Sequence, residues 1–162
     1  MSERFVREGC VADAARIAEI YNEGIADRIA TFETELRGPD QIAAWFANDY
    51  PVLVAGVDDR VMAYAAAFPY RSRPCYDGVR EFSIYVAREG RGRGFGRAAL
   101  TGLIEEAGRR GWWKLLSRIF PENTASLKLC DSLGFRRVGI YEKHGKLDGV
   151  WRDVVIVEKL LV

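Results

Sequence analysis

The sequence predicts an α+β fold in which helices flank a mixed, mostly antiparallel sheet. Three strand-like segments precede a glycine-rich stretch, "RGRGFGR", at residues 91–97. The strand before this stretch and the helix and strand after it imply a parallel crossover, which makes the sheet mixed. With 162 residues, 49% of them hydrophobic, the chain has the length and the apolar content for one core. We therefore expect residues 1–162 to form a single domain.

The first elements follow from their periodicity. A short strand is expected at residues 4–8, and a helix at 13–25 has apolar side chains at helical spacing, with Asp13 as its candidate cap. A second helix opens at Pro39, a favoured residue in a first helical turn. Residues 26–38 have no clean period, so they are free to reach a functional site.

The remaining segments alternate between the apolar pattern of strands and the apolar spacing of helices. Residues 50–68 predict two strands around an Asp-Asp turn, and residues 78–87 predict a third strand after a polar excursion at 69–77. The pattern after the glycine stretch predicts a helix at 98–110, a strand at 112–120, a helix at 125–133 and a hairpin at 135–161 that turns near 145–149.

Charge and cysteine content exclude several classes of protein. The net charge of +1 provides no global field toward nucleic acid or anionic lipid, so neither is an expected partner. Cys10, Cys75 and Cys130 are widely spaced and odd in number, which fits reduced thiols rather than a disulfide framework or a zinc site. The first ten residues lack the apolar run of a signal peptide. We expect a cytoplasmic protein without a metal.

The glycine stretch is a candidate phosphate site. A P-loop is excluded, because the single Gly-Lys pair is followed by Leu147 instead of Ser or Thr. A dinucleotide-binding loop is disfavoured, because the next strand ends in Ile119-Phe120-Pro121, with no acidic residue at the position that would hold a ribose. The pattern R-x-x-G-x-G at residues 91–96 remains, as a turn whose backbone N–H groups and following helix dipole hold a pyrophosphate without a metal.

The chain resembles the GCN5-related N-acetyltransferase (GNAT) superfamily over nearly its whole length. The resemblance lies in this motif, in the order of the elements and in the later segment "ENTASLKLCDSLGF". The resemblance implies that fold, with a splay between two parallel strands, and acetyl-CoA as co-substrate. Backbone groups of Ile84, Tyr85 and Val86 would hold the pantetheine arm. Asn123 and Ser126 lie in the matching later motif. The loop that takes the pyrophosphate would comprise Arg91, Gly92, Arg93, Gly94, Phe95, Gly96 and Arg97.

Smaller clusters are similar to phosphinothricin, methionine sulfoximine and arsinothricin N-acetyltransferases. These clusters are "IYNEGI", "TFETE", "YPVLVA", the "YD" before "REFSIYV", and "DGVWRDV". The resemblance implies a small acceptor, a glutamate-like amino acid with a tetrahedral or oxyanionic side-chain head. It also implies a homodimer, in which the apolar closing strand at 153–162 either joins the interface or pairs within the chain.

Glu81 is the candidate general base. Acetyl transfer requires an unprotonated amine, so a base must lie within reach of the acceptor ammonium. Glu81 begins the strand that leads to the glycine stretch, and the apolar neighbours Phe82, Ile84 and Val86 could make it a stronger base. The resemblance implies a catalytic glutamate here. The alternative is an exposed carboxylate paired with Arg80 or with an arginine across the sheet.

Other residues are candidates for binding the acceptor. Arg71 and Arg73 have planar guanidinium groups that suit a carboxylate or phosphinate, and the resemblance implies basic substrate-binding residues in this segment. Thr31 and Phe32 lie in the stretch that forms one wall of the pocket in relatives. The alternative is solvated arginines and a Phe32 in the core.

Two conspicuous residues, His144 and Cys130, are not expected to take part in catalysis. His144, the single histidine, is expected to face water in a turn. Cys130 falls where relatives have a general acid, but a thiol on an apolar helix face is expected to pack. Water or a hydroxyl such as Tyr141 would then protonate the leaving thiolate.

No nucleophile with an activating partner is evident, which favours direct attack by the amine, with an oxyanion held by a strand N–H such as that of Val86. Two alternatives stay open. The same fold could acetylate another amine, for example a ribosomal-protein N-terminus, or it could be a non-catalytic CoA-binding module.

Overall fold

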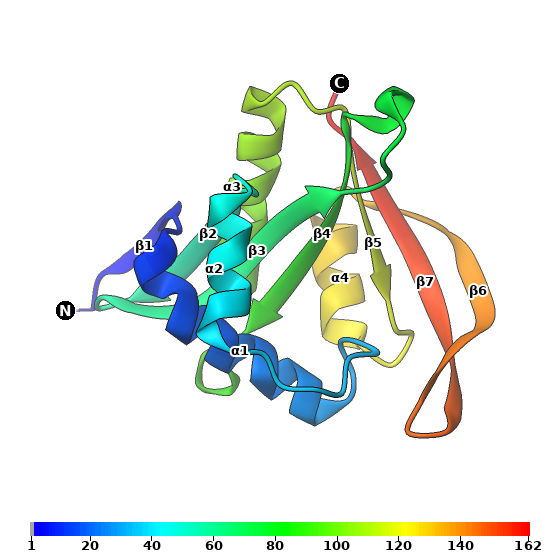
Figure 1. Cartoon of the computed structure of the whole chain (residues 1–162), viewed down its shortest axis with the longest axis horizontal. Coiled ribbons are helices and arrows are strands. Elements are labelled where there is room, and N and C mark those ends of the chain that lie inside the picture. Colours follow the sequence, from blue (N-terminus) through cyan, green and yellow to red (C-terminus); the bar gives the residue numbers. More distant parts are fainter. Residues whose placement is uncertain (1) are drawn as a thin grey trace.

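The computed structural model describes residues 2–162 and contains a seven-stranded sheet in the order β1-β2-β3-β4-β5-β7-β6. Helices cover both faces of this sheet (Figure 1). The predicted α+β fold with a mixed sheet is confirmed. The strands are β1 (Arg4–Glu8), β2 (Val52–Val57), β3 (Arg60–Pro69), β4 (Val79–Val86), β5 (Lys114–Ile119), β6 (Arg136–Leu147) and β7 (Val150–Leu160). The helices are α1 (Ala14–Asp27), α2 (Pro39–Ala47), α3 (Phe95–Arg109) and α4 (Thr124–Ser132).

The parallel pair is β4 and β5, joined by α3 as the crossover. Their pairing covers only three positions, from Val79 with Lys114 to Glu81 with Leu116. Beyond Glu81 the two strands separate, while β4 keeps its antiparallel partner β3 as far as Val86. One edge of β4 therefore loses its backbone partner from residue 83 onward and faces a gap in the sheet.

The core forms on both sides of β3 and β4. On one face Tyr21 of α1 stacks on Tyr85 at 5.0 Å between ring centroids, and Tyr85 stacks on Tyr64 at 5.5 Å. Leu100 and Leu103 of α3 are fully buried on the opposite face. Because successive residues of a strand point to opposite faces, α1 meets the odd-numbered residues of β4 and α3 meets the even-numbered ones.

Three details make the sequence-based expectations more specific. Asp13 occupies the expected N-cap position of α1, but its side chain makes no capping hydrogen bond there; it accepts a hydrogen bond from the Cys10 N–H and pairs with Arg7 instead. The α3 helix begins at Phe95 instead of residue 98, so residues 95–97 of the glycine stretch belong to its first turn. Of the two alternatives for the closing strand, pairing within the chain is found, because β7 lies inside the sheet between β5 and β6.

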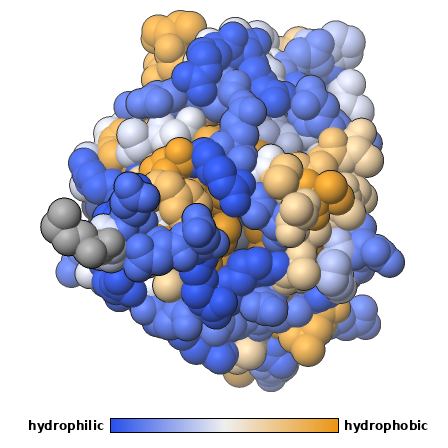
Figure 2. Space-filling model, turned by 90° about the vertical axis from the view of Figure 1, so that its left-hand side faces the viewer, coloured by the Kyte–Doolittle hydropathy of each residue, from blue (hydrophilic) through white to orange (hydrophobic). Residues whose placement is uncertain are grey.

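The two edges of the sheet differ in character. At β1 the exposed residues are charged apart from Val6, and such charges discourage further strand pairing. Figure 2 shows that the surface at this end of the molecule is mostly hydrophilic. The β6 edge instead exposes the apolar side chains of Val138 and Ile140. Within residues 2–162, no helix is long and apolar enough to cross a membrane.

Candidate active site

Three adjoining hollows lie along the gap between β4 and β5. One, of about 210 Å³, is lined by Arg91, Gly92 and Ser126, and is called the glycine-loop cleft below. Another, of about 430 Å³, is lined by Glu81 and is called the Glu81 pocket. A small hollow between the separating strands joins them, and all three share Tyr85 as a lining residue. The gap thus connects the glycine stretch to the Glu81 carboxylate.

The glycine stretch forms a turn that points backbone donors outward. Gly92 and Gly94 have φ angles of +75° and +85°, which side chains rarely allow. Gly94 is the N-cap of the 15-residue α3 and has no side chain to cap the first turn. The first N–H groups of α3 therefore lack a side-chain acceptor, and together with the helix dipole they favour an anion.

The other residues of the stretch hold this turn in place. Phe95 is buried, with the guanidinium groups of Arg4 and Arg93 stacked on its ring. Arg97 donates a 2.7 Å hydrogen bond to the hydroxyl of Ser132, which ties α3 to α4. A Cβ on Gly96 would lie 3.0 Å from Val86, so glycine allows α3 to approach β4 closely.

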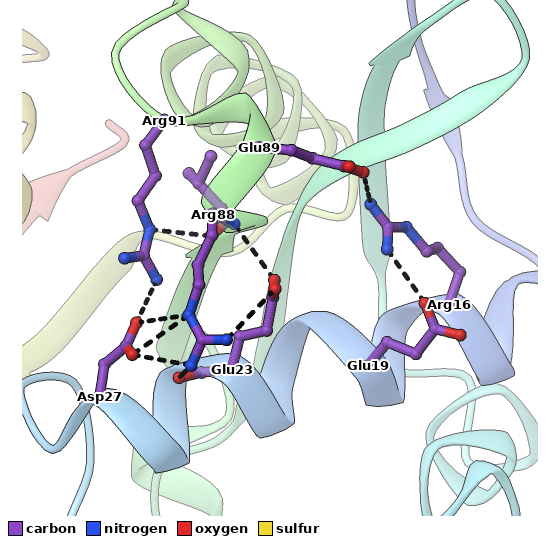
Figure 3. A network of polar contacts seen from close by, with 8 residues as sticks. Arg16, Glu19, Glu23, Asp27, Arg88, Glu89 and Arg91 are labelled. Carbon is purple, nitrogen blue, oxygen red and sulfur yellow. Dashed lines mark hydrogen bonds and ion pairs between the residues drawn. The ribbon is translucent and has the colours of Figure 1, made fainter.

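A charged network anchors the stretch to α1 (Figure 3). Asp27, the last residue of α1, lies 2.7 Å from a guanidinium nitrogen of Arg91 and 2.8 Å from one of Arg88. Hydrogen bonds from Arg88 and then Arg91 hold the pKa of the Asp27 carboxyl below its usual range, although partial burial opposes this shift. Arg91 also donates to the Val86 carbonyl. Asp27 therefore connects α1 to the loop beside the cleft.

The start of α4 completes the glycine-loop cleft. The Asn123 side chain caps the helix by accepting a hydrogen bond from the Ser126 N–H at 3.3 Å, and both residues line the cleft. Cys130, one turn further on, is fully buried, and burial raises the pKa of its thiol to about 12. The prediction that Cys130 packs is confirmed.

The Glu81 pocket contains an ion pair across the gap. Oε1 of Glu81 lies 3.6 Å from a guanidinium nitrogen of Arg118 on β5. Both side chains keep access to solvent, with 34% of Glu81 and 45% of Arg118 exposed. This is the arginine across the sheet that the alternative for Glu81 anticipated.

The pocket around Glu81 has apolar lining residues, including Phe32, Phe120 and Val154, but Ile84 and Val86 from its own strand are not among them. Phe82, Ile84 and Val86 have the opposite parity to Glu81, and alternate strand residues point to opposite faces. The side chains on its own face are those of Ser83 and Tyr85, which also line the pocket.

The walls of the pocket come from two distant segments. Thr31 and Phe32 follow α1, and Phe32 packs edge-on against Phe120 with 4.8 Å between ring centroids. His144 and Gly145 come from the end of β6. A Cβ on Gly145 would lie 2.9 Å from the Phe32 ring, so the two walls are in close contact.

Comparison with known proteins agrees with this geometry. The model of the acetyltransferase (GNAT) family matches residues 17–135. This chain belongs to the GNAT family. An L-amino acid N-acyltransferase, MnaT, of Escherichia coli is 36% identical over 98% of this chain and 92% of its own. A Salmonella typhimurium L-methionine sulfoximine/L-methionine sulfone acetyltransferase is 34% identical over 91% of this chain and 88% of its own.

Two further matches extend the comparison. A phosphinothricin N-acetyltransferase of Streptomyces coelicolor is 29% identical over 96% of this chain and 95% of its own. Among solved structures, the Salmonella typhimurium yncA protein with its cofactor acetyl-CoA superposes with a TM-score of 0.95 at 32% identity. That match covers 99% of this chain and 95% of the other.

The GNAT cofactor has a suitable site in these residues. The unpaired edge of β4, the outward N–H groups of the glycine turn and the uncapped start of α3 suit a molecule with amides and a pyrophosphate. Within residues 2–162, no group of three or more His, Cys, Asp or Glu side chains is placed to hold a metal ion.

Two predicted substrate residues of this GNAT protein lie outside the Glu81 pocket. Arg71 and Arg73 are exposed in the segment between β3 and β4, and neither lines the pocket. Arg71 stacks on Tyr70, with 4.9 Å from its guanidinium carbon to the ring centroid. In contrast, Thr31 and Phe32 do line the pocket.

Sequence analysis missed two residues that this GNAT pocket contains. His144 is exposed, as expected, but it lies in β6 instead of in a turn, and it also lines the pocket. Arg118 was not singled out at all, although a lone arginine in the apolar run "LLSRIF" was a usable signal. It lies two positions beyond Leu116, the partner of Glu81, and therefore on the same face of the sheet.

Proposed function

We propose that this protein acetylates the α-amine of a small glutamate-like amino acid of the phosphinothricin, methionine sulfoximine or arsinothricin type, with acetyl-CoA as donor. One observation supports the proposal above the others. The Glu81 carboxylate lies in a pocket that adjoins the glycine-loop cleft, so the proposed base would be next to the proposed thioester site. The names of the amino-acid-acetylating relatives support the acceptor class.

Acetyl-CoA would supply the acetyl group as a thioester. Backbone groups of Ile84, Tyr85 and Val86 on the open edge of β4 would hold its pantetheine arm. Asn123 and Ser126 would border the arm from α4. The pyrophosphate would lie on the turn formed by Arg91, Gly92, Arg93, Gly94, Phe95, Gly96 and Arg97, with Phe95 acting only as the buried anchor of that turn.

Glu81 would act as the general base. It takes one proton from the acceptor ammonium, directly or through one water, and leaves a neutral amine. The amine nitrogen then forms a bond to the acetyl carbon while the carbon–sulfur bond breaks. The nitrogen loses its second proton to water, a water molecule protonates the leaving thiolate, and the proton on Glu81 returns to solvent. The Val86 N–H would stabilise the oxyanion.

Water is the proposed source of the proton on the leaving thiolate. Cys130 is unsuitable, because it is buried and its thiol pKa is raised to about 12. Tyr141 is half exposed on β6 and does not line the Glu81 pocket. The open pocket, in contrast, admits solvent next to Glu81 and Ser83.

Thr31 and Phe32 are proposed to contact the acceptor side chain. Arg71 and Arg73 are proposed to bind its oxyanionic head. Because both arginines lie outside the pocket, this role requires the segment between β3 and β4 to move over it when an acceptor binds. Arg73→Ala would then raise the acceptor KM and leave the acetyl-CoA KM unchanged.

The assay is release of free CoA thiol from acetyl-CoA with phosphinothricin, methionine sulfoximine, arsinothricin, glutamate and a basic peptide. Saturable turnover with a glutamate analogue supports the proposal, and turnover with the peptide alone refutes it. Glu81→Gln is expected to lower kcat by roughly 10²-fold with the acetyl-CoA KM unchanged. Glu105→Gln, on the exposed side of α3, is the matched control.

A homodimer in the cytoplasm is also proposed. The three cysteines are free, in keeping with a reducing compartment. Since β7 is interior, the β6 edge with its exposed Val138 and Ile140 is the better surface for a second copy. Light scattering after size-exclusion chromatography measures the mass, and a monomer at micromolar concentration contradicts the dimer.

A further inference from the structure

The ion pair between Glu81 and Arg118 is loose. Its 3.6 Å separation exceeds the roughly 2.7–2.9 Å of a charge-assisted hydrogen bond. By comparison, Asp27 and Arg91 are 2.7 Å apart. Within the described chain, residues 2–162, Arg118 has this single ion pair. Both charged groups therefore retain the capacity to take a second partner.

The position of the pair is set by the separation of the strands. Glu81 is the last residue of β4 that pairs with β5, and Arg118 lies two residues past its partner Leu116. The two side chains thus face each other where the gap opens. Ser83 continues the same face of β4 toward the glycine-loop cleft. An acceptor between Glu81 and Arg118 would have the thioester site directly beside it.

An α-amino acid carries the matching charges. Its ammonium and carboxylate are attached to one carbon atom, so a carboxylate and a guanidinium side by side can bind both at once. We propose that Arg118 binds the α-carboxylate of the acceptor while Glu81 receives its ammonium. The inference rests on the proposed function and names the group by which this site would recognise a free amino acid.

When the acceptor replaces the ion pair between Glu81 and Arg118, every charge still has a partner of opposite sign. In the free protein Glu81 and Arg118 neutralise each other, and in the complex each would face one charge of the acceptor. A carboxamide or a peptide would bring the ammonium without the carboxylate. Arg118 would then lose its carboxylate partner and gain no replacement, which costs binding energy. Free amino acids should therefore be preferred over their amides.

A purely structural role for the pair makes a different prediction. If Arg118 only ties β5 to β4, its loss should lower stability and affect all acceptors equally. If Arg118 binds the carboxylate, its loss should reduce turnover of the amino acid specifically. The ratio of kcat/KM for an amino acid to kcat/KM for its carboxamide separates the two roles.

The test compares Arg118→Gln with the wild type, using methionine sulfoximine and its carboxamide as acceptors. The variant is expected to lose roughly 10- to 100-fold in kcat/KM for the acid and less than about threefold for the amide. Arg118→Lys keeps a cation and should recover part of the ratio. Arg109→Gln, an exposed arginine at the end of α3, should leave the ratio unchanged.

If Arg118→Gln loses kcat/KM equally for the acid and the amide, the ratio of the two is unchanged. This result would overturn the role of Arg118 and leave the proposed function standing. A wild type that prefers the amide would overturn it too. If wild-type protein acetylates no amino acid in the panel, the proposed function fails and this inference fails with it. Should Arg118→Gln not fold, the wild-type preference and Arg118→Lys decide the question.

Discussion

The hydroxyl of Ser117 donates a 2.8 Å hydrogen bond to the carbonyl of Phe82 across the gap between β5 and β4. This buried bond follows directly after the last backbone pair, Glu81 with Leu116. A side chain thus replaces the next ladder bond, and the strands diverge beyond it. The bond sets where the gap begins and hence where the Glu81 pocket meets the glycine-loop cleft.

Removing this hydroxyl should weaken the fold. Ser117→Ala is expected to lower the free energy of unfolding by about 1–2 kcal/mol, because the buried Phe82 carbonyl loses its partner. For a chain of this size, each kcal/mol corresponds to a fall in Tm of about 2–4 °C. Thermal denaturation measures the change, with exposed Ser72→Ala as the control. A stability equal to that of the wild type would show that water satisfies the carbonyl.

The link between Asp27 and Arg91 should matter for cofactor binding. Asp27→Asn removes the charge that holds Arg91 beside the glycine turn. For a partly exposed pair worth about 1 kcal/mol, the KM for acetyl-CoA should rise roughly fivefold with the acceptor KM unchanged. Initial-rate kinetics test this, with Asp49→Asn as the control, because Asp49 pairs with Arg110 at the far end of α3 from the glycine stretch. A change in the acceptor KM alone would contradict the assignment.

Two glycines of α3 form a matched pair for testing the close contact with β4. Gly96→Ala would place a Cβ 3.0 Å from Val86 and push α3 away from the strand. We expect the acetyl-CoA KM to rise roughly tenfold, equivalent to about 1.4 kcal/mol of overpacking.

The partner variant is Gly108→Ala, whose added Cβ would meet no atom within 4 Å. It should stabilise the helix by about 0.5–1 kcal/mol and leave the KM unchanged. Equal KM values for the two variants would show that the contact between Gly96 and Val86 does not control cofactor binding.

The three cysteines should differ in reactivity. Because burial raises the pKa of the Cys130 thiol to about 12, almost no thiolate is present at pH 8, and the side chain is inaccessible. Iodoacetamide should therefore label the exposed Cys10 and Cys75 in the native protein, and Cys130 only after denaturation. Peptide mass spectrometry reads out each site. Rapid native labelling of Cys130 would contradict its assignment as a packing residue.

Several features followed from the sequence because they depend on neighbouring residues. Glycines 92 and 94 mark a turn with positive φ wherever it lies in the fold, and the strand–helix–strand pattern requires a parallel pair. The buried face of α1 could likewise be predicted from spacing alone, since a helix of period 3.6 aligns its apolar residues. The acetyltransferase family and its α+β fold were recognisable on these grounds.

The composition of the Glu81 pocket was decided by tertiary structure. Which arginine meets Glu81 depends on the register of β4 with β5, so Arg118, 37 positions away in sequence, lies beside it while the nearer Arg71 and Arg73 do not. His144 reaches the pocket because this part of β6 lies against Phe32, which comes from a segment more than 100 positions earlier. Backbone preferences act between adjacent residues, so they can be predicted from the sequence. Strand order and register arise from the packing of the whole chain, so they cannot be predicted from neighbouring residues.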